Sequence, residues 1–167
     1  GNEIPTGRSI NALTINNSAG VDINNDLFLG SSSSGTGLVL TAGIVSVAPG
    51  KALKFTNGAY LGTAGTATSF VNGAVSLTVG ASNTRTWPIG AAGKNRKVVM
   101  TGLARTGGTG TFEMKFYIEA VGSGTPGAGL TSLSTARRWI NAITPGTANF
   151  GSYTSISFDY FGDAAND

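Results

Sequence analysis

The chain has 167 residues and a formal net charge of +3, and it contains neither Cys nor His. This composition excludes disulfides, thiol chemistry, the usual kinds of zinc site and acid–base catalysis by His. Only 11% of the residues are charged and 40% are hydrophobic, while Gly, Thr, Val, Ser and Asn are abundant. These proportions are typical of an all-β protein and argue against a disordered chain.

Hydropathy and charge argue against a membrane-spanning segment and against nucleic-acid binding. No apolar run is long enough to cross a membrane, and no signal peptide is visible, so we expect a processed mature chain or a segment of a longer one. The excess of positive charge lies entirely in residues 81–167. It is too weak for nucleic-acid binding, which needs Lys and Arg clustered over a face.

The N-terminal half is a series of short apolar segments. Residues 1–9 are predicted to be an extended lead-in, and apolar segments follow at 10–15, 21–23 and 27–29. The run of serines at 31–34 predicts a loop.

A repeat of 15 residues follows this loop. LVLTAGIV begins at Leu38, LKFTNGAY at Leu53 and TSFVNGAV at Thr68. A recurrent apolar–turn–apolar unit predicts stacked rungs, each of which covers the apolar face of the next. A series of β-hairpins with turns at Asn57-Gly58 and Asn72-Gly73 would produce a similar pattern.

The C-terminal half has longer alternating segments with an aromatic core. Strands are predicted at 75–79, 84–90, 96–103, 111–121 and 153–161, the clearest being 111–121, where apolar and charged residues alternate. Residues 134–143 fit either a helix capped by Ser134 or a strand. Together these segments match a small β-sandwich.

The predicted fold class is therefore all-β. We expect a short β-solenoid-like or stacked-strand N-terminal half, residues 1–80, joined to a β-sandwich at residues 81–167. The boundary is placed near Gly80–Asn83, and the strand at 75–79 could belong to both cores.

Six segments share a family pattern by their order along the chain. They are LTINNSAGVDINNDLFL from Leu13, LVLTAGIVSV from Leu38, SFVNGAVSLTV from Ser69, NTRTWPIG from Asn83, RRWINAI from Arg137 and YTSISFDY from Tyr153. This order resembles the repetitive modules of large surface and secreted proteins of Bacteroidota-type bacteria, many of which use the type IX secretion route. Trp87 stands where that family more often has Phe, and the family's C-terminal secretion signal is not visible. The resemblance implies an extracellular β-solenoid-plus-sandwich module with an adhesive or structural role.

Acidic residues do not form a convincing metal or catalytic site. Asp22, Asn24 and Asp26 have the spacing of a calcium loop, but Leu27 and Ser33 occupy the positions where an EF-hand needs Gly and Glu. Asp159, Asp163 and Asp167 read as a solvated tail. Glu113 and Glu119 lie about 20 Å apart along one strand, which exceeds the separation that glycosidases use. We expect no metal, no cofactor and no enzyme activity.

Basic and aromatic residues supply the remaining candidates. Five basic residues could form a patch, but a solubilising surface is the simpler interpretation; they are Arg85, Lys94, Arg96, Lys97 and Arg105. Aromatic faces can stack on sugar rings, and Tyr117, Trp87 and Trp139 are the candidate glycan contacts among the aromatic residues, which also include Tyr60 and Tyr153. Tyr117 is the best of them because it lies on the charged face of its strand, whereas both Trp residues also suit a core.

The sequence therefore predicts a non-enzymatic extracellular β-protein that is a module of a large surface protein or a self-assembling filament subunit. Its expected partners are itself or neighbouring modules, through open β-edges, with the lead-in at residues 1–9 as a segment that could be donated. The alternative is a glycan-binding module, and a more remote one is a flat ice- or mineral-binding face of Thr, Ser and Asn.

Overall fold

The computed structural model describes residues 7–30, 35–56, 58–63, 65–79, 83–106, 110–117, 138–144 and 149–158. All the regular structure in these ranges is β, as expected, and no helix occurs in them. The strands are β1 (Ser9–Ile10), β2 (Leu13–Asn16), β3 (Val21–Ile23), β4 (Leu27–Leu29), β5 (Thr36–Ala42), β6 (Val45–Val47), β7 (Ala52–Phe55), β8 (Tyr60–Thr63), β9 (Val71–Asn72), β10 (Ala74–Val79), β11 (Asn83–Trp87), β12 (Gly90–Ala91), β13 (Lys94–Asn95), β14 (Val98–Thr106), β15 (Gly110–Tyr117), β16 (Arg138–Thr144), β17 (Asn149–Ser152) and β18 (Ser155–Phe158).

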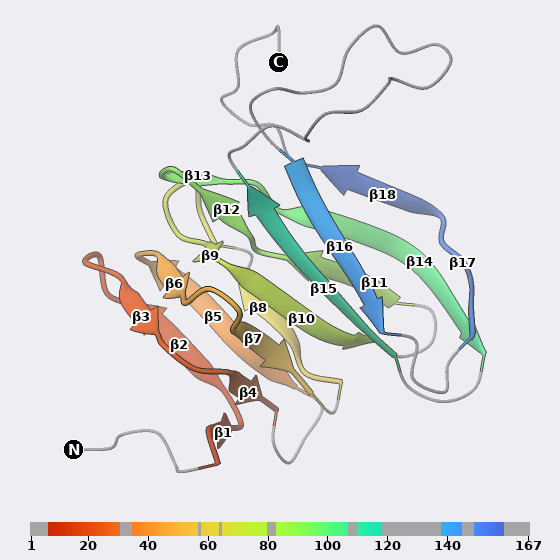
Figure 1. Ribbon diagram of the computed structural model, residues 1–167, viewed down its shortest axis with the longest axis horizontal. Helices are drawn as coiled ribbons and strands as arrows, with labels where there is room; N and C mark the ends of the chain where they lie inside the picture. The colour runs from red at the N-terminus through yellow and green to blue at the C-terminus, as the bar shows by residue number, and fades with distance from the viewer. Residues whose placement is uncertain are drawn as a thin grey trace, which may run out of the picture.

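The N-terminal half makes three successive coils of three strands each. Every strand pairs in parallel with the strand at the same place in the next coil: β2 with β5 and β5 with β8, β3 with β6 and β6 with β9, β4 with β7 and β7 with β10. The coils therefore lie side by side, as Figure 1 shows, and apolar side chains that point inward stack on one another. The preceding β1 pairs with β4, also in parallel.

The register of this pairing corrects the predicted repeat. Leu38 pairs with Leu13 and Leu61, and Leu53 pairs with Leu27 and Val75, so that paired positions are 22 to 26 residues apart and not 15. The motifs at 38 and 53 therefore belong to different sheets of the same coil. The period of 15 arose because an apolar segment followed by a glycine turn occurs at more than one corner of each coil.

Backbone hydrogen bonds join the coils at the corner between the first and second strand of each. The Val21 N–H donates to Ile44 O at 2.9 Å, and in the next coil the Val45 N–H donates to Phe70 O at 2.9 Å. Gly43 turns the chain here with a φ of 89°, in the left-handed region that favours glycine. A Cβ at this position would overlap the carbonyl of Asn17 in the coil below.

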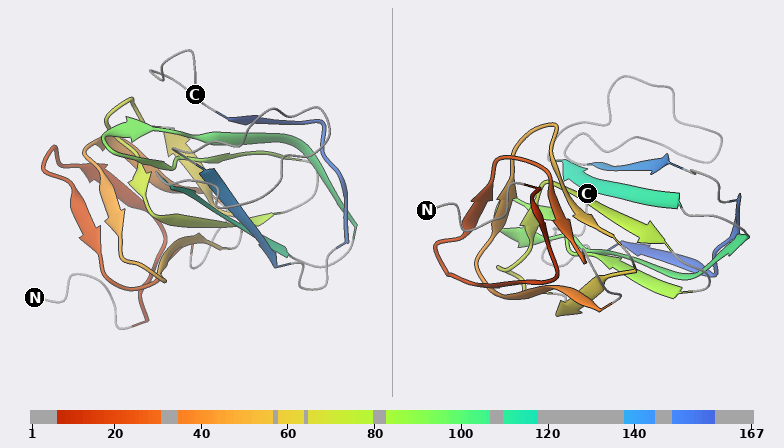
Figure 2. Two further views of the ribbon diagram at one scale, coloured as in Figure 1. Left: turned by 45° about the horizontal axis from the view of Figure 1, so that its top comes forward. Right: turned by 90° about the horizontal axis from the view of Figure 1, so that it is seen from below.

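The C-terminal half continues the stack with antiparallel strands. On one side β10 pairs with β7, and on the other it pairs antiparallel with β15, which pairs with β16. This makes one six-stranded sheet in the order β1-β4-β7-β10-β15-β16. A second sheet of β11, β14, β17 and β18 lies in a separate layer, as the right-hand view of Figure 2 shows. The six-stranded sheet thus contains strands from both sides of the domain boundary predicted near Gly80–Asn83. The division into two domains stays a prediction.

A single apolar cluster fills the interior of both halves. It extends from Ile15 and Leu29 in the first coil to Trp87 and Phe116 in the antiparallel part. The alternation predicted for 111–121 is confirmed as far as it is described, because Phe112, Met114 and Phe116 are buried. Of the two alternatives for 134–143, the described part, 138–144, is a strand.

Candidate functional site

A shallow groove of about 210 Å³ crosses the outer face of the six-stranded sheet. In one row across the strands, Lys54 stands beside Ser76, and Ser76 beside Glu113. Their neighbours along each strand, such as Leu53 and Met114, are buried in the core, so this row points outward. The groove results from small side chains between longer ones.

The residues that line it differ in chemistry. Ala52 and Ala74 are cross-strand partners on β7 and β10, and Ala142 of β16 is the partner of Glu113. Besides these small residues and Gly50, the lining contains three lysines, two carboxylates and one exposed aliphatic side chain. These residues are Lys51, Lys54, Lys115, Asp26, Glu113 and Ile140.

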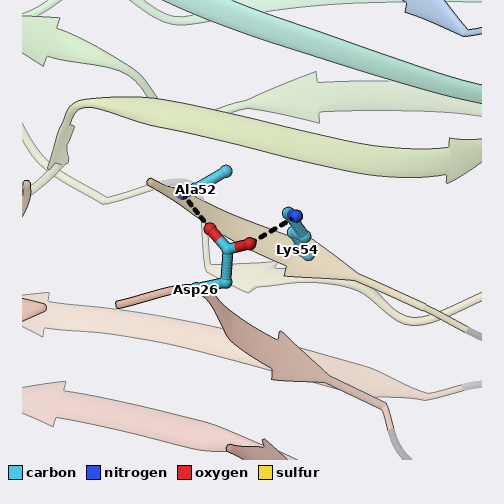
Figure 3. A network of polar contacts seen from close by, with 3 residues as sticks. All are labelled: Asp26, Ala52 and Lys54. Carbon is cyan, nitrogen blue, oxygen red and sulfur yellow. Dashed lines mark hydrogen bonds and ion pairs between the residues drawn. The ribbon is translucent and has the colours of Figure 1, made fainter. Parts of the chain in front are cut away.

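Asp26 is the best-defined polar group of the groove. Its Oδ2 lies 2.6 Å from Lys54 Nζ, and its Oδ1 accepts a hydrogen bond of 2.9 Å from the Ala52 N–H (Figure 3). The Lys54 hydrogen bond is the main reason that the pKa of Asp26 is lowered, and it outweighs burial, which acts in the opposite direction. This contact joins the first coil to the second and takes up both carboxylate oxygens.

The predicted calcium spacing does not produce a cation site in the described chain. Asp26 is held by Ala52 and Lys54, and Asp22 is exposed. Nowhere in the described ranges do three or more acidic residues come together in a way that could hold a metal ion. The tail carboxylates at 159, 163 and 167 and Glu119 lie outside these ranges.

Trp87 is a core residue and not a glycan contact. Its side chain is 0% exposed, and its indole N–H donates to Phe112 O at 3.2 Å. The centroids of the Trp87 and Phe112 rings lie 6.3 Å apart. The expectation that Trp87 could contact a ligand is wrong, because Trp87 lies between the two sheets of the antiparallel part.

Trp139 of β16 contacts aromatic residues of both sheets and remains partly accessible. Its ring packs between Phe116, at 4.9 Å between centroids, and Phe158, at 5.1 Å. Its indole N–H donates to Arg96 O at 3.3 Å. Tyr117 ends β15, but its side chain is not among those that the structure describes. The structure therefore does not place the three predicted glycan contacts on one surface.

The basic residues considered as a possible patch, for which a solubilising surface was the simpler interpretation, lie in different surroundings where the structure describes them. Arg96 is only 3% exposed, with its guanidinium 5.9 Å from the centre of the Phe116 ring, so it belongs to the interior. Burial lowers the pKa of Arg85, which lines a pocket together with Tyr60 and Leu61 of β8. Lys94 lies on a two-stranded hairpin, and the side chain of Arg105 is not described. The lysines of the groove, which sequence reasoning missed, are the cations that the fold does bring together.

The only sequence signal for the groove is the alternation of Leu53-Lys54-Phe55 and of Phe112 to Phe116, which puts charges on the outer face. The register between β7, β10 and β15 was needed to bring those charges together. The chain matches no protein-family model, no curated protein and no solved structure. Within the described residues, no helix is long and apolar enough to span a membrane.

Proposed function

We propose that the protein is a non-enzymatic extracellular β-protein that serves as a structural or adhesive module of a surface assembly. Its N-terminal half is a short parallel β-solenoid, and its C-terminal half is a small β-sandwich built on the last coil. The observation that carries the proposal is the parallel ladder of three coils. Two strands of the first coil, β2 and β3, are edge strands in the described part of the chain. Open β-edges recruit further strands through backbone hydrogen bonds.

Two other observations support a binding role over catalysis. Asp26, one of the two carboxylates in the groove, is held in an ion pair and a backbone hydrogen bond, which leaves Glu113 without a second carboxylate available as an acid–base partner there. The order of motifs that resembles bacterial surface modules also agrees with an extracellular structural role.

Self-capture tests this function. The purified chain is immobilised at low density, and free copies of the same chain are passed over it, with an unrelated protein of similar charge as the reference surface. We expect concentration-dependent, saturable capture of the free copies on the specific surface alone. A complete lack of capture up to the highest soluble concentration would contradict the proposal.

The groove favours a second candidate function, the binding of an acidic polysaccharide. Lys51 and Lys115 both line the groove, and their ammonium groups can donate hydrogen bonds to uronate carboxylates. Isothermal titration with polygalacturonate, and with a neutral polysaccharide as reference, tests this reading. The Lys51→Ala/Lys115→Ala variant should lose the binding, whereas Lys94→Ala/Lys97→Ala, which removes the same charge elsewhere, should keep it. Equal binding by both variants would remove the groove from consideration.

A further inference from the structure

The first coil leaves core positions incompletely covered. Val21 of the first coil is partly buried, whereas its partner Val45 in the second coil is 0% exposed. In the same way Leu13 is partly buried and its partner Leu38 is 0% exposed. These pairs occupy equivalent positions, so the difference arises because the described chain provides no further coil to cover the first.

Backbone groups of the first coil also point away from the stack. The Val21 N–H donates to Ile44 O, and Ile23 O accepts from the Ala48 N–H, so both residues face the second coil. Because successive residues of a strand point their backbone groups to opposite sides, the N–H and C=O of Asp22 point outward. Neither β2 nor β3 contains the Lys or Pro that commonly protects an edge strand.

The same chain covers two of the three strands at the other end of the stack. The third strand of the last coil, β10, is covered by β15. The second, β9, is followed by Ile89, which forms a bridge with Val71, and the Val71 N–H donates to Pro88 O at 2.7 Å. The first, β8, lines one pocket together with β11 but is an edge strand in the described part of the chain. A second copy therefore cannot pair all three strands of its first coil with the last coil of another.

From these features we infer that two copies of the chain associate through their first coils, in a closed two-fold dimer with antiparallel pairing of the edge strands. This inference rests on the proposed function and names the edge through which self-association occurs. Because the same chain covers the last coil at β9 and β10, the first coil of one copy is left to meet the first coil of another, and a contact between identical surfaces closes after two copies. A two-fold axis that keeps both apolar interiors on the same side reverses the strand direction, which gives antiparallel pairing.

Sedimentation equilibrium of the full chain over a wide concentration range tests the inference. The chain mass is 16.8 kDa, and we expect a single monomer–dimer equilibrium with no larger species. Asp22→Pro removes the outward N–H without touching the groups that face the second coil, and it should weaken dimerisation at least about tenfold. Asp22→Asn keeps that N–H and should dimerise like the parent chain. Far-UV circular dichroism confirms that each variant is folded.

Several outcomes would overturn the inference. A monomeric full chain, open-ended polymers, or equal dimerisation of Asp22→Pro and Asp22→Asn would each do so. A chain that becomes dimeric only after deletion of residues 1–6 would show that this lead-in covers the edge instead. In the self-capture experiment, capture that persists in Asp22→Pro would refute this contact while leaving the proposed function intact, because another edge would then be responsible.

Discussion

Replacing Gly43 with alanine tests whether the coils are in contact as described. Gly43 has a φ of 89°, and an added Cβ would overlap the carbonyl oxygen of Asn17 in the preceding coil. Both partners of this clash are backbone, so no side chain can rotate to relieve it. Gly50 is a natural control because its φ is 72° but nothing lies within 4 Å of the added Cβ.

The expected magnitude follows from the two parts of the perturbation. Alanine in the left-handed region costs about 1–2 kcal/mol at either position. At Gly43 the coils must also separate locally, which weakens the hydrogen bonds from the Asn17 N–H to Ala42 O, 3.1 Å, and from the Val21 N–H to Ile44 O, 2.9 Å. Each contributes about 1 kcal/mol, so Gly43→Ala should lower the free energy of unfolding by about 3–4 kcal/mol and Gly50→Ala by about 1–2 kcal/mol.

Urea unfolding followed by far-UV circular dichroism and tryptophan fluorescence measures this difference. The two signals should change together, and the slope of free energy against urea should be similar for both variants, so that midpoints can be compared directly. If the two variants lost the same stability, the close approach of Gly43 to Asn17 would be refuted, and with it the register of the first two coils.

Two further perturbations act on single contacts. Asp26→Asn removes the ion pair with Lys54 but keeps an acceptor for the Ala52 N–H, so it should lower stability at pH 7 by about 0.5–1 kcal/mol. Because the pKa of Asp26 is lowered on folding, the ion pair stabilises the protein above the unfolded pKa of about 3.9, and this contribution is lost as the pH falls through the lower folded pKa. The urea midpoints of the parent chain and the variant should therefore converge in acid. A difference in midpoint that stays constant with pH would contradict the assignment. Trp87→Phe leaves a buried void and loses the hydrogen bond to Phe112 O, and should cost about 2–3 kcal/mol, clearly more than Trp139→Phe at a partly exposed position. Thermal unfolding checks this order, and an equal effect would contradict the burial of Trp87.

Several local features of the fold could be predicted because they depend on neighbouring residues. The segments Val21–Ile23 and Leu27–Leu29 are strands with the bounds expected from their apolar residues and the polar turns around them. The alternation of Phe112, Met114 and Phe116 identified the buried face of β15. In each case the side-chain period of two is itself the signal of a strand with one buried face.

The candidate site could not be predicted in the same way. Lys54 and Lys115 are far apart in the chain, and each is an ordinary outward residue of its own strand. Trp87 and Trp139 looked equivalent as aromatic residues in apolar segments, yet one is fully buried and the other is partly exposed. Their exposure depends on which strands cover them, and that is not encoded in local spacing.

The sequence by itself determined that this is an all-β protein without thiol or imidazole chemistry, because composition and alternation act locally. Only the tertiary structure decided which strands are partners. The corners of each coil share an apolar segment and a glycine turn, so local similarity suggested a period of 15, while hydrogen bonding joins positions 22 to 26 residues apart. The groove and the open edge of the first coil both follow from that pairing, because each is formed by strands that meet only when the chain has completed a full coil.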